Sequence, residues 1–209
     1  MKVSNDSDTE APLAHGDVDA PLPLPAGRQW HLARDTHEDA LTAFEFALLQ
    51  VRESFERYAV QAMRVASDLD LTFTEVVALH VVAMQDRPKD SATIAQLMNR
   101  DDLPNLQYSL RKLVKLELIE RTKSRTAAVF TITPQGRAVA NRYAALRRQS
   151  LTTNLSELSA VPSRLQQAIR SMHVITGLYE SGSRELATID PSVILTDGPT
   201  TESKDSRSG

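Results

Sequence analysis

The sequence predicts a mainly α-helical protein with one small β-hairpin, which places it in the α+β class. Three observations predict this class: a long apolar stripe at helical spacing, two helical segments separated by a short polar turn, and two runs of β-branched residues after them. The chain has 209 residues, of which 41% are apolar and 24% are charged. This length and composition are typical of one globular domain or two small ones.

The first predicted element is a long helix within residues 30–71. Apolar residues recur at alternating spacings of three and four from Leu41 to Leu69, with no proline or glycine between residues 36 and 71. A helix of about thirty residues is about 45 Å long, which exceeds what the core of a domain this size needs. We therefore expect residues 30–71 to be a dimerisation helix that packs on a second copy of the chain. A helix covered only by its own chain is the alternative.

Two shorter helices are expected next. Thr72 or Thr74 can cap a helix that runs to about Gln85. Ser91 is expected to cap a short helix over residues 92–99. A polar turn of four residues then separates this short helix from the following one.

The helix after that turn is predicted over residues 103–116. Asp102 is a candidate capping residue, and Pro104 lies in the first turn, where a missing backbone N–H does no harm. At 100° per residue, one side of this helix is apolar and is expected to face the core. The residues on that side are Leu106, Leu110 and Leu113.

A β-hairpin follows this helix. Residues 118–122 and 127–133 are the predicted strands, and a basic turn joins them. A short helix, a turn, a longer helix and a hairpin follow one another in the order of a winged helix-turn-helix. We therefore predict such a lobe over residues 72–137.

Helices are predicted after the lobe, and both ends are expected to be disordered tails. The helices cover about residues 134–155 and 162–182. Residues 1–29 are acidic and proline-rich, and residues 188–209 are similarly polar, so neither segment can bury enough apolar surface to fold. No apolar run of 18 residues and no secretory pattern occurs, so we expect a cytoplasmic protein.

Charge is distributed unevenly along the chain. The formal net charge is −3, yet residues 87–148 carry thirteen basic and five acidic residues, a net charge of +8. Residues 1–27 carry one base and five acids, a net charge of −4. The basic segment creates a local field that attracts a polyanion. A solvated face that is merely basic is the alternative.

The outer face of the 103–116 helix carries polar and basic residues and no acidic residue. A surface helix of a chain with more acids than bases normally mixes charges, so this face is a candidate surface for DNA. The predicted DNA-binding residues on the helix are Pro104, Asn105, Gln107, Tyr108, Arg111, Lys112 and Lys115. In the hairpin turn, Lys123 and Arg125 are predicted to reach an adjacent minor groove.

These residue types suit different parts of a duplex. Asn105 and Gln107 can pair with adenine at a major-groove edge, and Arg111 can pair with guanine. The two lysines of the face suit phosphates. Tyr108 can contact a phosphate through its hydroxyl or a thymine methyl through its ring.

Several motifs of the lobe resemble those of the MarR (multiple antibiotic resistance regulator) family, over about residues 40–180. The motifs are Ile94-Ala-Gln-Leu-Met, Leu110-Arg-Lys-Leu113, Leu118-Ile-Glu-Arg and Ile132-Thr-Pro-Gln-Gly-Arg137. The resemblance implies that residues 138–187 are C-terminal dimerisation helices and that each protomer offers one winged lobe to duplex DNA. It also implies a small aromatic or phenolic effector, in a pocket lined from residues 40–65, 74–84 and 134–150. The sequence does not identify the residues that bind the effector.

Two positions depart from the family pattern. Glu117 stands where the family usually has a glycine after the recognition helix. The hairpin is about three residues shorter, and Ser124-Arg125-Thr126 replaces the common Asp-x-Arg, so Arg125 is kept without the aspartate.

Catalytic and metal-binding functions are not predicted. The chain has no cysteine, which rules out disulfides, cysteine-based metal sites and thiol chemistry. His37-Glu38 begins like a zinc-protease helix, but Leu41 replaces the second ligand. His80 is read as a partly buried core residue. No nucleotide-binding glycine motif or serine-hydrolase motif occurs, so we expect no catalytic residue, metal or cofactor.

The sequence thus predicts a homodimeric, sequence-specific transcription regulator. Two recognition helices would enter successive major grooves of a pseudo-palindromic operator in double-stranded DNA. A small-molecule effector is expected from the resemblance alone. The alternative is a winged-helix protein-interaction module whose basic surface docks an acidic partner.

Overall fold

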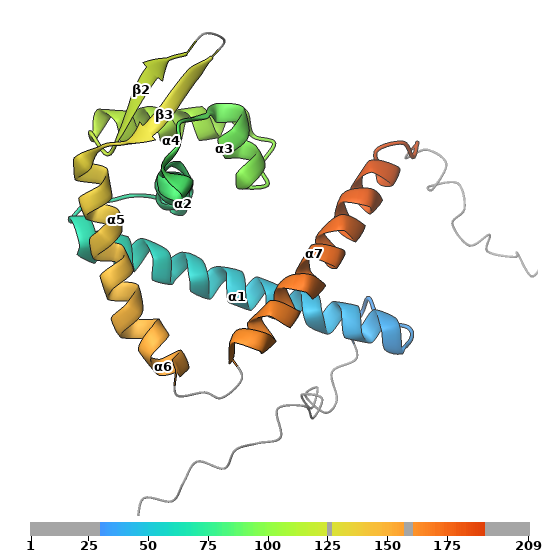
Figure 1. Ribbon diagram of the computed structural model, residues 1–209. Coiled ribbons are helices and arrows are strands. Elements are labelled where there is room, and N and C mark those ends of the chain that lie inside the picture. Colours follow the sequence, from blue (N-terminus) through green and yellow to red (C-terminus); the bar gives the residue numbers. More distant parts are fainter. Residues whose placement is uncertain (1–29, 125–126, 157–160, 191–209) are drawn as a thin grey trace, which may run out of the picture. The chain divides into compact units, whose positions relative to one another are not determined.

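The computed structural model describes residues 30–124, 127–156 and 161–190, and the chain divides into two compact units, Met1–Ala140 and Asn141–Gly209. The described residues are mostly helical, with one three-stranded antiparallel sheet (Figure 1). The predicted class, mainly α with a small hairpin, is therefore confirmed. The predicted tail over residues 1–29 lies outside the described residues, as does nearly all of the other tail.

The long first helix is confirmed as α1 (Thr36–Ser67). The Asp35 carboxylate caps it by accepting hydrogen bonds from the backbone N–H groups of His37 and Glu38. Within the chain, α1 buries only a patch near its C-terminal end, which packs on α2 (Phe73–Ala83). That patch consists of Ala59, Ala62, Met63 and Ala66.

A capping box fixes the start of α2. The Thr72 hydroxyl accepts a hydrogen bond from Glu75 N, and the Glu75 carboxylate accepts one from Thr72 N at 2.8 Å. Thr72 rather than Thr74 is therefore the cap. The helix ends two residues before the predicted Gln85, which has a φ of 64° in a 3₁₀ turn, Met84–Asp86.

A buried lysine closes the C-terminal end of α2. Lys89, in the short strand β1 (Lys89–Asp90), is 2% exposed, and its ammonium donates to the carbonyl oxygens of Val82, Met84 and Arg87. Burial lowers the pKa of Lys89. The sequence analysis predicted no strand here, because a two-residue strand leaves no periodic pattern.

The cap of the short helix is one residue earlier than predicted. Helix α3 (Ser91–Leu97) includes Ser91 as its first residue, and Asp90 is the cap, with its carboxylate accepting from Thr93 N at 2.7 Å. Hydrogen bonds from the backbone and side chain of Thr93 lower the pKa of Asp90 below its ordinary value of 3.8.

The Asp90 cap predicts a pH-dependent stability. Asp90→Ala is expected to lower the free energy of unfolding by about 1 kcal/mol at pH 7. Because the folded-state pKa of Asp90 is lowered, its contribution is fully present above about pH 4 and is lost below that value, as the pH falls through the folded-state pKa. Urea unfolding at several pH values measures the difference between variant and parent. A difference that stays constant down to pH 2 contradicts the prediction, and Asp90→Asn is the control that keeps a cap without titrating.

The helix predicted over residues 103–116 and the hairpin lie close to their predicted bounds. Helix α4 (Leu103–Lys115) begins at Asp102, whose carboxylate accepts from Asn105 N at 3.2 Å. Strands β2 (Ile119–Lys123) and β3 (Ala128–Ile132) pair antiparallel, and β1 pairs with the other edge of β3. The tip of the hairpin, residues 125–126, lies outside the described part of the chain.

The predicted apolar side of α4 is confirmed. Leu106, Leu110 and Leu113 are fully buried, and α4 packs on α2, α3 and β2. Side chains from each of these elements complete the core of the lobe. They include Leu79, Ile94, Leu118 and Ile119. This packing directs the opposite side of α4 to solvent.

Glu117 occupies a backbone conformation that suits glycine. It has a φ of 57°, in the left-handed region, directly between α4 and β2. Glu117→Gly is expected to raise the free energy of unfolding by up to about 1 kcal/mol, because an L-residue is strained in this region. Thermal unfolding of the full chain measures this change in stability. Glu120→Gly, in strand β2, is the control and is expected to be destabilising; equal losses in the two variants contradict the prediction.

The closing helices differ in detail from their predicted form. The predicted helix over residues 134–155 consists of α5 (Pro134–Arg147), a π-helical segment Arg148–Thr152 and α6 (Thr153–Ser156). Helix α7 (Val161–Leu186) continues four residues beyond the predicted Gly182. Large apolar side chains on α7 are exposed in the single chain, including Leu165, Ile169 and Met172. None of the described helices has the length and hydropathy needed to span a membrane.

Candidate nucleic-acid interface

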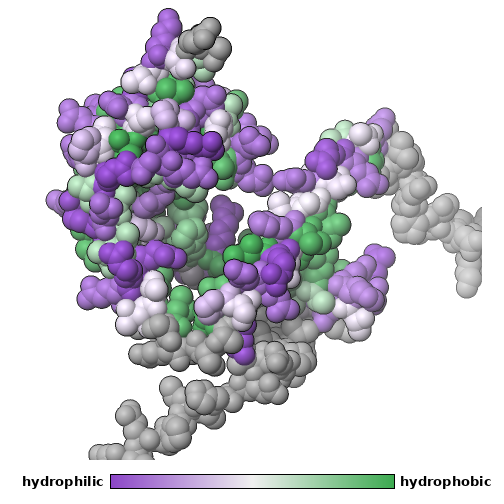
Figure 2. Space-filling model, viewed as in Figure 1, coloured by the Kyte–Doolittle hydropathy of each residue, from purple (hydrophilic) through white to green (hydrophobic). Residues whose placement is uncertain are grey.

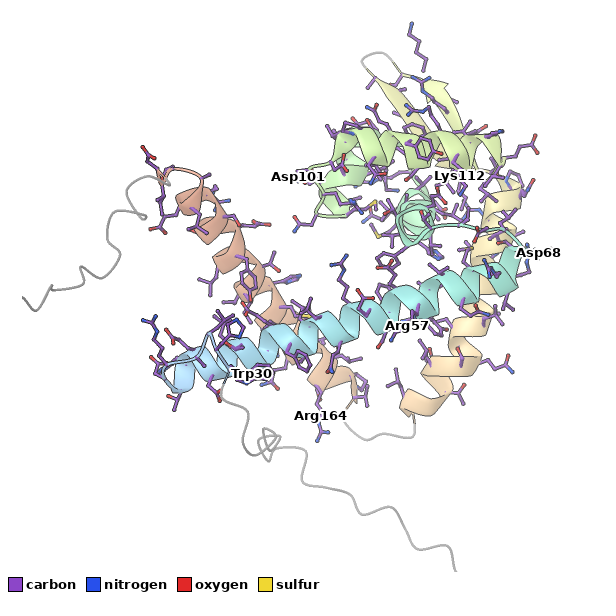
Figure 3. The ribbon with its side chains drawn as sticks, turned by 180° about the vertical axis from the view of Figure 1, so that it is seen from behind. Trp30, Arg57, Asp68, Asp101, Lys112 and Arg164 are labelled. Atoms are coloured by element: carbon purple, nitrogen blue, oxygen red, sulfur yellow. The ribbon has the colours of Figure 1, made fainter. Side chains whose placement is uncertain are left out.

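The predicted outer face of α4 is exposed to solvent. Tyr108 is 63% exposed, and α4 contains no acidic residue along its whole length. Two aspartates precede the helix: Asp102 is its cap, and Asp101 lies at its start (Figure 3). The other exposed members of the face are Pro104, Asn105, Gln107, Arg111 and Lys115. This arrangement leaves a polar surface of neutral and basic side chains available to a ligand.

A hollow of about 360 Å³ separates part of this face from the hairpin. Helix α4 contributes Gln107 and Arg111 to its wall, and the sheet contributes Arg121 and Phe130. A second hollow of about 420 Å³ lies along the outer side of α4 and is lined by Tyr108, Arg111, Lys112, Lys115 and Leu116. Arg111 borders both hollows, which makes it the central cation of the face.

Arg121 is a basic residue of this region that the sequence analysis did not select. It lies in β2, is exposed, and pairs in register with Phe130 of β3. Residues two positions apart in a strand lie on the same face of the sheet, so Arg121 lies on the same face as the buried Ile119. The predicted strand could therefore have indicated Arg121 as a neighbour of α4. The guanidinium of Arg121 adds a second arginine to the hollow between α4 and the hairpin.

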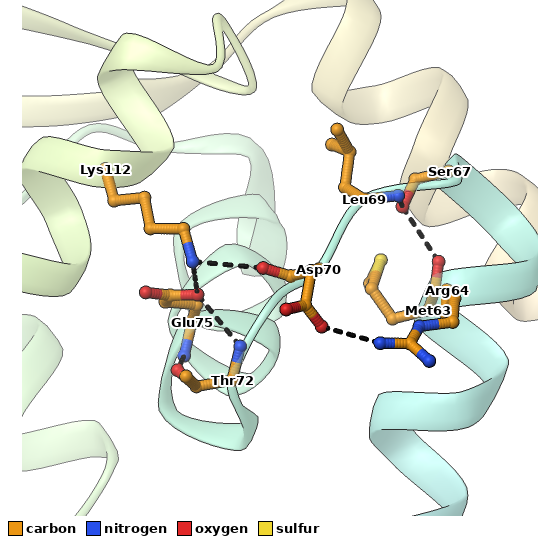
Figure 4. A network of polar contacts seen from close by, with 8 residues as sticks. All are labelled: Met63, Arg64, Ser67, Leu69, Asp70, Thr72, Glu75 and Lys112. Carbon is orange, nitrogen blue, oxygen red and sulfur yellow. Dashed lines mark hydrogen bonds and ion pairs between the residues drawn. The ribbon is translucent and has the colours of Figure 1, made fainter.

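Lys112 differs from the other predicted DNA-binding residues. Its ammonium lies 2.8 Å from the Glu75 carboxylate and donates to the Asp70 carbonyl oxygen at 3.0 Å (Figure 4). Its side chain is 34% exposed, on the side of α4 that faces α2. The partners lie 37 and 42 positions earlier in the chain, so no local pattern indicated them.

The hairpin residues are only partly described. Lys123 is exposed at the end of β2, where its backbone pairs in register with Ala128. Arg125 lies outside the described residues. A contact of this turn with a minor groove therefore stays a prediction.

The basic segment is less available than its charge suggests. Lys89 is buried, Lys112 is paired with Glu75, and Arg137 forms an ion pair of 2.7 Å with Asp86. Among the described residues, the exposed cations of α4 and the hairpin are Arg111, Lys115, Arg121 and Lys123. In Figure 2 the visible face of the region around the hairpin is mainly hydrophilic. The exposed positive charge of this region therefore lies on α4 and β2.

The histidines form no metal site in the described residues, which hold no cluster of three or more potential metal ligands. His80 is half-buried on α2, as the sequence analysis predicted. Burial lowers the pKa of His80, so its imidazole is neutral at pH 7.

Comparison with known proteins agrees with this geometry. Residues 71–136 match the family model of a winged helix DNA-binding domain. A solved MarR family transcription regulator superposes with a TM-score of 0.57 at 16% sequence identity, over 72% of this chain and 97% of that one. The chain has the fold of a MarR-family regulator. The predicted resemblance to MarR proteins is therefore confirmed for the fold.

Two further solved structures are similar to this chain in fold. The RV1404 protein of Mycobacterium tuberculosis gives a TM-score of 0.53 at 19% identity, over 69% of this chain and 97% of that one. The transcriptional regulator BldR of Sulfolobus solfataricus gives a TM-score of 0.53 at 16% identity, over 66% of this chain and 98% of that one. No curated protein matches the sequence. In this MarR-type fold, α4 is the second helix of the helix-turn-helix and the hairpin is the wing.

Proposed function

We propose that this chain is a homodimeric, sequence-specific transcription regulator that binds double-stranded DNA through the outer face of α4. The observation that carries the proposal is the exposed, acid-free face of this helix within a winged helix domain. The second helix of such a domain enters the major groove. A helix that merely covered a core would not need an outer face free of carboxylates.

The side chains of this face suit both kinds of DNA contact. Arg111 can donate two hydrogen bonds to a guanine edge, and Asn105 and Gln107 can pair with adenine. Lys115 and Arg121 supply cations for phosphates beside the groove. Lys123 and Arg125 remain proposed contacts of the wing with the minor groove.

The apolar face of α1 supports the homodimer. Leu48, Val51 and Phe55 are 40–59% exposed in the single chain, although they belong to the predicted apolar stripe. An exposed apolar surface of this length is typical of an oligomer interface. Two lobes joined in this way would read two half-sites about one helical turn apart.

Arg111 provides the test of the DNA-binding site. A duplex selected from a random pool by the full chain serves as probe, and Arg111→Ala is expected to weaken its binding by about 1–3 kcal/mol. The matched control is Arg52→Ala, which removes one exposed arginine from α1, outside residues 71–136. Mobility-shift titrations at fixed salt measure both. Equal affinities of Arg111→Ala and the parent remove Arg111 from this role, and a pool without enriched sequences favours an acidic protein partner instead.

A small-molecule effector is also part of this proposal. The resemblance implied a pocket lined from residues 40–65, 74–84 and 134–150, whereas we place the effector in a hollow of the winged lobe. The hollow between α4 and the hairpin, about 360 Å³, lies within the usual size of small-ligand pockets. An anionic aromatic compound bound beside Arg111 and Arg121 would compete directly with DNA. Release of the selected duplex by such a compound, measured by fluorescence anisotropy, tests this part of the proposal.

A further inference from the structure

Glu75 is a buried carboxylate that needs a cation. Its side chain is only 3% exposed, because it lies among the buried residues of α2. One oxygen of Glu75 accepts from Thr72 N, and the same oxygen accepts from the Lys112 ammonium at 2.8 Å (Figure 4). Removal of one partner of a buried pair leaves an uncompensated charge, so Glu75 holds Lys112 firmly.

The same ammonium also holds the segment between α1 and α2. Lys112 donates to the carbonyl oxygen of Asp70 at 3.0 Å, and the Asp70 carboxylate forms an ion pair of 2.8 Å with Arg64 of α1. Beside this pair, the Ser67 hydroxyl donates to the Met63 carbonyl and accepts from Leu69 N. A continuous set of polar contacts therefore joins the end of α1, the start of α2 and the recognition helix (Figure 4).

We propose that Lys112 is a positioning residue, which holds the recognition helix α4 against the α1–α2 junction and makes no contact with DNA. This inference rests on the proposed function and reassigns one of its predicted phosphate contacts. Lys112 fixes the rotation of α4 about its axis, because its ammonium is held at two points, Glu75 and the Asp70 carbonyl, beside the buried leucine side of the helix. A fixed rotation of α4 in turn fixes how far the side chains of Arg111 and Tyr108 extend into the DNA groove.

Lys115 is the matched control for Lys112. It lies on the same helix, one turn away, and it is exposed on the outer face. A lysine that contacts a phosphate contributes about 0.9 to the slope of log K against log salt concentration. The slope is negative, and Lys115→Gln is therefore expected to reduce its magnitude by about 0.9 per protomer. Lys112→Gln is expected to leave the slope unchanged.

A second readout separates positioning from simple stabilisation. At a temperature where each variant is folded by circular dichroism, Lys112→Gln is expected to lower the ratio of specific to non-specific DNA affinity about tenfold. Glu75→Gln is expected to lower this affinity ratio by the same factor. The double variant Glu75→Gln/Lys112→Gln is expected to lower it no further than either single variant does. Lys112→Arg is expected to retain most of the ratio. Should Lys112→Gln fail to fold, the double variant, which leaves no unpaired charge, is measured instead.

The outcomes distinguish this inference from the proposed function. A fall in slope for Lys112→Gln equal to that for Lys115→Gln means that Lys112 contacts a phosphate, and it overturns the inference while DNA binding stands. An unchanged slope with an unchanged affinity ratio means that Lys112 only stabilises the lobe, which overturns it as well. Absence of specific binding by the parent chain refutes the proposed function itself.

Discussion

Gly136→Ala is expected to destabilise the winged lobe by about 3 kcal/mol or more. A Cβ atom at this position would lie 1.9 Å from the Leu118 carbonyl oxygen and 2.8 Å from its carbon. Both are backbone atoms and cannot move aside as the end of a flexible side chain would. Ile132 Cγ1, at 3.1 Å, closes the remaining side.

The surrounding contacts explain why this approach is so close. Thr133 N donates to the Leu118 carbonyl, and the Thr133 hydroxyl lies 2.6 Å from the Glu117 carbonyl oxygen. The same hydroxyl accepts from Gly136 N at 3.0 Å. The end of α4 and the start of α5 are thus joined through the Thr133-Pro-Gln-Gly136 motif, and movement of Gly136 would displace the end of α4.

Gly177→Ala is the matched control for this prediction. Gly177 lies in α7, where no heavy atom lies within 4 Å of an added Cβ. Its replacement is expected to raise the free energy of unfolding by about 0.5–1 kcal/mol. Urea unfolding followed by circular dichroism measures both variants. The explanation of Gly136 is wrong if the two substitutions change stability by similar amounts.

Val51→Asp is expected to prevent dimerisation. Val51 is 59% exposed in the single chain and lies on the apolar stripe of α1. In the proposed homodimer the new carboxylate would be buried without a partner in each protomer, so the dimer dissociation constant is expected to rise by at least about 100-fold. Sedimentation measures the result as a fall toward the mass of one chain, 23.1 kDa.

Gln50→Asp is the control for the dimer. It adds the same charge at the neighbouring exposed position, about 100° away around the helix, outside the stripe. This variant is expected to remain dimeric and to bind the selected duplex as the parent does. A parent chain that sediments as a monomer at micromolar concentration contradicts the dimer, and so does a Val51→Asp variant that stays dimeric.

The elements with a strong local signal were predictable from the sequence. Helix α4 begins at Asp102 with Pro104 in its first turn, and its three leucines occupy the predicted buried side. The hairpin follows from two β-branched runs, and Thr72 caps α2 as one of two candidates. Each of these features depends on residues within about four positions of one another, where spacing alone determines the geometry.

Features that depend on distant residues were not predictable. Lys112 was assigned to phosphates because it is basic and lies at the edge of the outer face, yet its partners come from α2 and the segment before it. Lys89 belongs to a two-residue strand that exists only through pairing with β3. Asp90 rather than Ser91 caps α3, because either residue type satisfies the local rule and only the fold selects one.

Photocrosslinking from position 108 tests the central claim, that the outer face of α4 enters a DNA groove. Tyr108 is replaced by photoreactive benzoylphenylalanine in the full chain, and Glu53 on α1 is replaced in the same way as the control. With the selected duplex, we expect crosslinks to bases from position 108 and none from position 53. Absence of crosslinks at position 108 in a variant that still binds the duplex would contradict the account.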